Sequence, residues 1–149
     1  MGQIAAANAA WKLIMKTTRN QTGKPINPAP KQSTVQPQKL LSPFVVYDTD
    51  TLKTALLAIE KNEHRTVIVT NKGNIVVGVL SDGDARASLL DGRLLSTPIH
   101  RVMNTDFLAV GPKERLKAKA ILAQGHIFMI PVVDAQGELL DVLKSSDTL

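Results

Sequence analysis

The chain has 149 residues, of which 44% are hydrophobic and 3% aromatic, and it contains no cysteine. This length suits one compact domain or two small halves that share a core of aliphatic side chains. The lack of cysteine excludes disulfides, thiolate metal sites and a cysteine nucleophile, and it fits a cytoplasmic setting. No apolar run approaches the roughly 20 residues of a membrane span, and the first ten residues lack the pattern of a secretory signal.

The formal net charge of +5 is unevenly distributed along the chain. Residues 1–41 contain only basic charges, whereas the remainder is nearly neutral. A short helix is predicted over residues 4–15 and a Pro-rich linker over 17–39. We therefore predict a basic N-terminal arm over residues 1–41. Its main interpretation is a solvated leader, and the alternatives are an anion- or nucleic-acid-binding arm and an organelle-targeting leader.

The folded body is expected to begin near Leu41, and its first part carries five predicted elements. They are a strand over 44–47, a helix over 52–61, strands over 66–70 and 75–80, and a helix over 82–90. The stretch 48–51 offers side-chain oxygens for capping the first helix. Leu52, Ala55, Leu56 and Ile59 are spaced to face inward. A hairpin turn is predicted over 71–74, with Gly73 suited to a positive φ.

The second part repeats this order of elements. A strand is predicted over 107–110, a helix over 113–123 opened by Gly111 and Pro112, and strands over 128–133 and 138–143. The two copies align at an offset of 64 residues as far as Gly73 and Gly137, after which one residue is lost. The second copy lacks its last helix because the chain stops two residues after Asp147. From this we expect the chain to be a piece of a longer protein.

The resulting fold class is α/β, with two β-α-β-β-α repeats packed face to face in pseudo-two-fold symmetry. Two such units bury a core that neither could close alone, and a ligand is expected at the seams between them. We divide the chain into the arm (residues 1–41), a first repeat (42–103) and a truncated second repeat (104–149).

Three segments within these repeats carry a family resemblance. Residues 130–134 (Ile-Pro-Val-Val-Asp), 98–103 (Pro-Ile-His-Arg-Val-Met) and 78–84 (Gly-Val-Leu-Ser-Asp-Gly-Asp) resemble a tandem pair of CBS domains, also called a Bateman module. They are most similar to pairs attached to sugar-phosphate nucleotidyltransferases and sugar-phosphate isomerases. The resemblance implies a non-catalytic module that binds AMP, ADP or ATP between the repeats. It also implies a homodimer that regulates an attached enzyme, expected to be a nucleotidyltransferase beyond Leu149.

The resemblance implies contact residues in the first copy. The family motif Ser/Thr-x-x-Asp falls on Ser81 and Asp84. The Asp84 carboxylate can accept hydrogen bonds from ribose hydroxyls, and the Ser81 hydroxyl can donate to a phosphate oxygen beside a helix N-terminus. Arg86, with Arg65 or Arg101, can supply countercharge. Thr66 is included among the predicted nucleotide contacts.

The second copy departs from the motif. Lys144 replaces the hydroxyl residue while Asp147 keeps the carboxylate, so the first cleft is expected to be the better nucleotide site. Lys144 either serves a phosphate or is solvated. Pro131 lies in the segment of the family's adenine pocket, and it also suits a structural role at a strand entry.

Several simpler interpretations remain open. Asp84 and Asp147 can act only as helix caps, and the module can be a structural dimerisation unit with vestigial clefts. No catalytic residue is predicted. No metal site is predicted either, because Asp82 and Asp84 lack further ligands at EF-hand spacing, and none of the three histidines has a metal-binding context.

Overall fold

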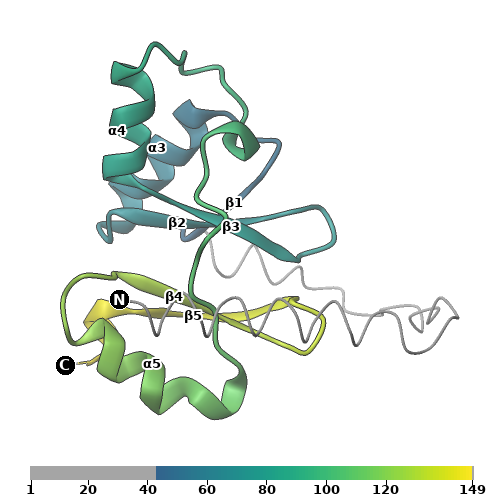
Figure 1. Cartoon of the computed structure of the whole chain (residues 1–149), viewed down its shortest axis with the longest axis vertical. Helices are drawn as coiled ribbons and strands as arrows, with labels where there is room; N and C mark the ends of the chain where they lie inside the picture. Colours follow the sequence, from purple (N-terminus) through teal and green to yellow (C-terminus); the bar gives the residue numbers. More distant parts are fainter. Residues whose placement is uncertain (1–42, 149) are drawn as a thin grey trace, which may run out of the picture.

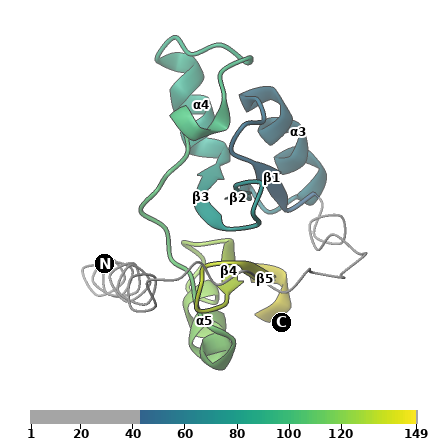
Figure 2. The same cartoon turned by 90° about the vertical axis from the view of Figure 1, so that its right-hand side faces the viewer.

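The computed structural model describes residues 43–148, which form four layers (Figure 1). Two small sheets lie against each other in the middle, and helices cover their outer faces (Figures 1 and 2). Residues 43–103, called the first half below, contain a three-stranded sheet, and residues 104–148, the second half, contain a two-stranded sheet. The predicted α/β class is confirmed.

The first sheet is built around a fully buried central strand. Strand β1 (Val45–Tyr47) runs parallel to β2 (Thr66–Thr70), and β2 pairs antiparallel with β3 (Val76–Ser81). All five residues of β2 are buried. Helices cover one face of this strand and the second sheet covers the other, which is why its sequence is a continuous run of β-branched residues rather than an alternating one.

Two helices cover the outer face of the first sheet, and each begins at a side-chain cap. Helix α3 (Leu52–Asn62) starts at Thr51, whose hydroxyl accepts a hydrogen bond from the backbone N–H of Thr54. Helix α4 (Asp82–Leu90) starts at Ser81. Caps of this kind satisfy backbone N–H groups that have no partner within the helix. The predicted inward residues Leu52, Ala55 and Ile59 are buried, and Leu56 is half-buried.

The second half is shorter and more irregular. Its elements are the 3-10 turn η2 (Pro112–Glu114), helix α5 (Arg115–Leu122), strands β4 (Met129–Val133) and β5 (Leu139–Lys144), and the 3-10 turn η3 (Ser145–Thr148). The two strands pair antiparallel. The segment that joins the halves contains one further 3-10 turn, η1 (Ile99–Arg101).

The two sheets meet through reciprocal backbone hydrogen bonds. The N–H of Val76 donates to the carbonyl of Gly137 at 3.0 Å, and the N–H of Leu139 donates to the carbonyl of Asn74 at 2.9 Å. An apolar cluster shared by both halves lies between the sheets and includes Ile68. Each half has an apolar cluster of its own as well, so the shared cluster matches the second of the two arrangements that the chain length allowed.

Strand pairing corrects the predicted alignment of the two copies. Thr66 pairs with Ser81 as Met129 pairs with Lys144, an offset of 63 residues, and both hairpins carry their bulge at the same place. The predicted offset of 64 holds only at the first strand, where Val46 and Val110 face equivalent partners. The missing residue therefore lies between the first strand and the helix of the second half, and not after the hairpin glycine.

This shift changes which residues are equivalent. Leu116, which the offset of 64 aligned with buried Leu52, is 83% exposed. The buried residues of α5 are Ala118 and Leu122. At an offset of 63 they align with Ala55 and Ile59, which are also buried. Burial and strand pairing thus agree on the same equivalence.

Two local predictions are wrong, and one predicted helix has different bounds. Residues 107–110 form a single parallel bridge from Val110 to Val132 instead of a strand. The predicted helix over 113–123 begins as a 3-10 turn and is helical only over Arg115–Leu122. In the first hairpin the positive φ of 63° belongs to Asn74, and not to Gly73. Asn tolerates this conformation, and Gly137 is its counterpart with a φ of 83°.

The predicted helix over residues 4–15 and the linker over 17–39 lie outside the described residues. Within residues 43–148, no helix combines the length and the apolar character needed to cross a bilayer.

Candidate ligand-binding cleft

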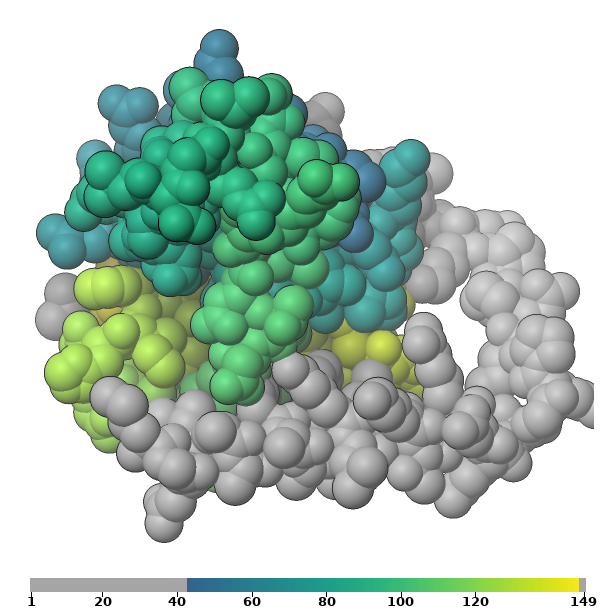
Figure 3. Space-filling model, turned by 45° about the horizontal axis from the view of Figure 1, so that its top comes forward, coloured from purple at the N-terminus to yellow at the C-terminus, as the bar shows by residue number. Residues whose placement is uncertain are grey.

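A cavity of about 1000 Å³ lies between the two halves. Its walls are the end of β3 with the start of α4, the connection from α5 to β4, and the segment that joins the halves. Figure 3 shows this joining segment, in green, bridging the first and second halves on the surface. The volume is within the range of small-molecule sites. Five of the eight predicted site residues line this cavity: Arg65, Thr66, Ser81, Asp84 and Arg86.

Ser81 and Asp84 are positioned by the turn from β3 into α4. The Ser81 hydroxyl oxygen accepts a hydrogen bond from the backbone N–H of Asp84 at 3.0 Å. Its own O–H is left to donate, since a hydroxyl has one donor and two acceptor positions. Within residues 43–148, no hydrogen bond or ion pair occupies the Asp84 carboxylate. The turn therefore presents one hydroxyl donor and one carboxylate acceptor to the cavity.

Arg65 enters the cavity from a tight connection between α3 and β2. Its backbone carbonyl accepts a hydrogen bond from the Asp82 N–H at 2.8 Å, and its φ is 58°. A left-handed conformation in a residue with a β-carbon costs roughly 1–2 kcal/mol. The guanidinium carbon lies 5.9 Å from the centre of the Phe128 ring, which belongs to the second half. Arg65 thus connects the two walls of the cavity through a cation–π contact.

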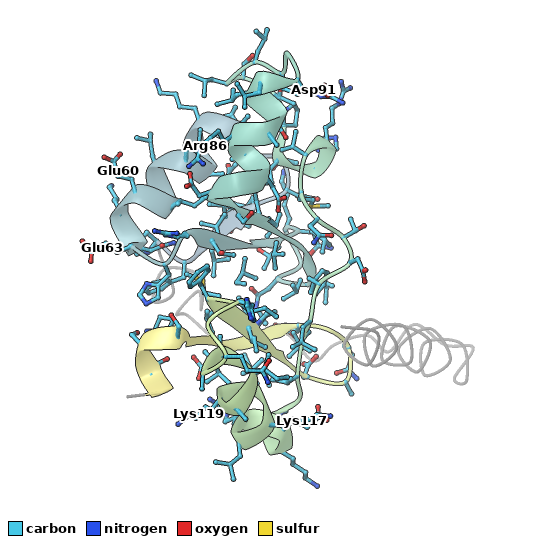
Figure 4. All side chains as sticks on the ribbon, turned by 60° about the vertical axis from the view of Figure 1, so that its left-hand side comes forward. Glu60, Glu63, Arg86, Asp91, Lys117 and Lys119 are labelled. Carbon is cyan, nitrogen blue, oxygen red and sulfur yellow. The ribbon has the colours of Figure 1, made fainter. Side chains whose placement is uncertain are left out.

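Arg86 is held by a neighbour on its own helix. Its Nη2 lies 2.6 Å from the Asp82 carboxylate, four residues earlier, and both side chains are well exposed. Figure 4 shows Arg86 on the side of α4 in the first half, whereas Lys117 and Lys119 lie on α5 in the second half. Arg101, the other cation considered for this site, lies in η1 and does not line the cavity.

Comparison with known proteins identifies the family. A profile described as the CBS domain matches residues 39–91. A Vibrio cholerae protein assigned to acetoin utilization (AcuB) is 31% identical and superposes with a TM-score of 0.62, covering 71% of this chain and 79% of that one. The chain belongs to the CBS-domain family.

Two further relatives of this CBS chain are informative. Arabinose 5-phosphate isomerase GutQ from Salmonella typhi is 31% identical over 94 residues, which are 62% of this chain and 29% of the isomerase. The chain thus spans less than a third of the length of the curated relatives it matches. CBSX2 from Arabidopsis thaliana, crystallised in complex with AMP, is 23% identical with a TM-score of 0.58, covering 70% of this chain and 82% of that one.

The sequence analysis missed the wall that the second half of the CBS chain contributes. This wall carries an acid, aromatic and aliphatic side chains and a histidine: Asp106, Phe107, Ile127, Phe128 and His126. None of these residues stands in a polar motif, and His126, like the other two histidines, has no metal-binding context in the sequence. Equivalence to Arg65 and Thr66 across the repeat points to residues 128 and 129 only at the offset of 63 that strand pairing reveals.

The remaining three predicted site residues lie outside this cavity. Pro131 is buried in the middle of β4, where its carbonyl accepts a hydrogen bond from the Val110 N–H at 3.1 Å. Lys144 and Asp147 lie where β5 passes into η3. The Lys144 N–H donates to the Asp147 carboxylate at 3.0 Å, and the ammonium lies 3.9 Å from the other carboxylate oxygen.

No group of three or more His, Asp or Glu side chains is arranged to hold a metal within residues 43–148. The lining residues of the cavity offer hydrogen bonds, charge and apolar contact.

Proposed function

We propose that this CBS chain is a non-catalytic regulatory module that binds an adenosine-containing nucleotide in the cavity between its halves. The observation that carries the proposal is the composition of the first-half wall. The Asp84 carboxylate is available to accept hydrogen bonds from both ribose hydroxyls. Ser81 and Arg65 offer a hydroxyl and a guanidinium to a phosphate. The AMP complex of the structurally similar CBSX2 supports this choice of ligand.

A ligand in this cavity is suited to regulation because its walls come from both halves. The nucleotide would contact β3 and α4 on one side and the connection from α5 to β4 on the other. Its affinity then depends on the relative position of the halves. The coupling free energy between two such sites is typically about 1–3 kcal/mol. It changes the equilibrium of an attached domain by about 5- to 150-fold.

We propose a sugar-phosphate isomerase as the attached enzyme. GutQ is an arabinose 5-phosphate isomerase, and its match favours this class over the nucleotidyltransferase expected from the sequence. The test is to assay the isomerase activity of the full-length protein with and without AMP. Unchanged kinetics at saturating AMP would contradict regulation.

Isothermal titration calorimetry with AMP, ADP and ATP tests the binding proposal directly. Asp84→Asn should weaken binding by about tenfold or more, because charge-assisted hydrogen bonds each contribute about 1.5–3 kcal/mol. Asp91→Asn is the matched control, since Asp91 lies at the far end of α4 and does not line the cavity (Figure 4). No heat with any nucleotide at millimolar concentration, or equal weakening in both variants, would overturn the proposal.

A second candidate function is dimerisation, which exposed leucines favour. Leu90 is 84% exposed at the end of α4, and Leu94 is 70% exposed in the loop that follows. Large exposed apolar patches mark interaction sites on soluble proteins, and these two leucines lie four residues apart in the chain. Light scattering of the wild type and of a Leu90→Asp/Leu94→Asp variant distinguishes the two candidates. If the variant is monomeric and still binds nucleotide, nucleotide binding does not depend on dimerisation.

A further inference from the structure

A second set of side chains makes contacts between the two halves, and none of its members lines the cavity. The Lys144 ammonium lies 4.7 Å from the centre of the Phe44 ring. The His64 ring meets the same Phe44 ring edge to face at 5.8 Å. His64 Nε2 lies 3.1 Å from the Ser146 hydroxyl, and Asp147 contacts Lys144 as described above. These five residues form one contact cluster, called the Lys144 cluster below, and both halves contribute to it.

Every member of the Lys144 cluster is the counterpart of a residue that lines the cavity. Strand pairing fixes the offset at 63 for the hairpins and at 64 for the first strand. The equivalent pairs are Phe44 with Leu108, His64 with Ile127, Lys144 with Ser81, Ser146 with Gly83, and Asp147 with Asp84. The cluster therefore occupies the place of a second cleft.

Most of the substitutions that distinguish the Lys144 cluster from the cavity lining increase the size of the side chain. Phe44 replaces a leucine, Lys144 replaces a serine and Ser146 replaces a glycine, so three of the four changed positions carry a larger side chain. The fourth change introduces the His64 ring, which donates or accepts hydrogen bonds where Ile127 cannot. Phe44, His64 and Lys144 are half-buried, so the atoms added at these positions take up room between the halves that a ligand would need.

The two equivalent carboxylates also differ in their surroundings. Within residues 43–148, the Asp84 carboxylate has no hydrogen-bonding or charged partner, whereas that of Asp147 contacts both the backbone N–H and the ammonium of Lys144. The Lys144 ammonium in turn lies against an aromatic ring, as a cation–π contact. One lysine thus engages both the carboxylate expected to bind ribose and an aromatic surface.

We infer that the second cleft is occupied by the chain's own Lys144, and that the chain binds one nucleotide instead of two. This inference rests on the proposed function, because it assumes that the first cavity takes a nucleotide. It reassigns Lys144 from a phosphate ligand to an internal occupant of the second cleft. It also makes Asp147 a partner of Lys144 that does not contact the ligand.

The test is the stoichiometry of AMP binding by calorimetry, using the full chain. The wild type should bind about one AMP, and Asp147→Ala should leave the affinity within about twofold. A Phe44→Leu/His64→Ile/Lys144→Ser variant, which copies the first cavity at three of the four changed positions, should bind about two. Adding Asp84→Asn to that variant should weaken one of its two sites. Lys119→Ser, on the exposed face of α5, is the control for loss of a lysine.

The outcomes separate this inference from the proposed function. Two AMP molecules per wild-type chain, or loss of affinity in Asp147→Ala, would overturn the inference and leave the proposed function intact. A triple variant that is folded by circular dichroism but still binds one AMP would also overturn it. No binding by any variant would overturn both. If the triple variant does not fold, Asp147→Ala and the wild-type stoichiometry still decide the question.

Discussion

Gly78→Ala should destabilise the protein where β3 packs against Met103 and Asn104, in the segment that joins the two halves. A β-carbon added to Gly78 would lie 2.8 Å from the Met103 sulfur and 3.0 Å from the Asn104 carbonyl oxygen. That carbonyl accepts a hydrogen bond from the Val79 N–H at 3.0 Å, and the Asn104 N–H donates back to Val79 at 2.8 Å. The Met103 side chain can move away, but the carbonyl cannot do so without stretching this pair of hydrogen bonds.

The expected cost follows from these contacts. Overpacking of this kind costs about 1–3 kcal/mol. The reduced entropy of the unfolded chain offsets about 0.4–1 kcal/mol. The free energy of unfolding should therefore fall by about 1–2 kcal/mol, which for a chain of this size is a decrease in Tm of about 2–8 °C. AMP binding should weaken as well, because Asn104 lines the cavity.

Urea denaturation followed by circular dichroism measures this difference, with Gly83→Ala as the matched control. A β-carbon at Gly83 would have its nearest neighbour, the Ser81 hydroxyl, at an ordinary 3.8 Å. Gly83 lies in the first turn of α4, where alanine is the better helix former by about 0.5–1 kcal/mol. The two variants should thus differ in sign. Equal stability of both, or a more stable Gly78→Ala, would refute the argument from close contact.

Three further changes test other parts of the fold by the same denaturation measurement. Leu122→Ala should cost about 2–4 kcal/mol because the side chain is 1% exposed, whereas Leu116→Ala should stay within about 0.5 kcal/mol. If Leu116→Ala cost more stability than Leu122→Ala, the result would support aligning the two copies at an offset of 64. Asn62→Ala should cost about 2 kcal/mol, since its buried amide donates to a carbonyl at the start of β2 at 2.9 Å. No change in stability would show that water takes the place of this amide. Arg86→Ala should change stability by less than about 0.5 kcal/mol, because its pair with Asp82 is exposed, and a larger loss would contradict this.

The sequence predicted the elements of the first half closely because their signals are local. Thr51 and Ser81 stand where helices need a cap, and the β-branched run of β2 indicates a buried strand. The same signals located Ser81 and Asp84, since the turn from a strand into a helix presents both side chains together. The second half was predicted less well, because residues 107–110 make one bridge where a strand was expected.

The alignment of the two copies was the least predictable feature, and it mattered most. Similar aliphatic residues allow an offset of 63 or 64 equally well in the sequence, since Leu116 looks as suitable for a core as Leu122. Only strand pairing and burial distinguish them. The same limitation hid the cavity wall around Phe128, which lies in no polar motif.

The sequence by itself determined that the chain is a duplicated α/β unit and that its two copies differ at the ligand turn, Ser81 against Lys144. Hydrophobic periodicity and capping act over a few residues, so these features can be read locally. The tertiary structure decided what the difference does. It brings Phe44 and His64 from the first half against Lys144 and Asp147 of the second, a meeting that depends on how two sheets pack. Contacts between residues about 100 positions apart leave no periodic trace in the sequence, because each side chain only acquires its partner when the shared core closes.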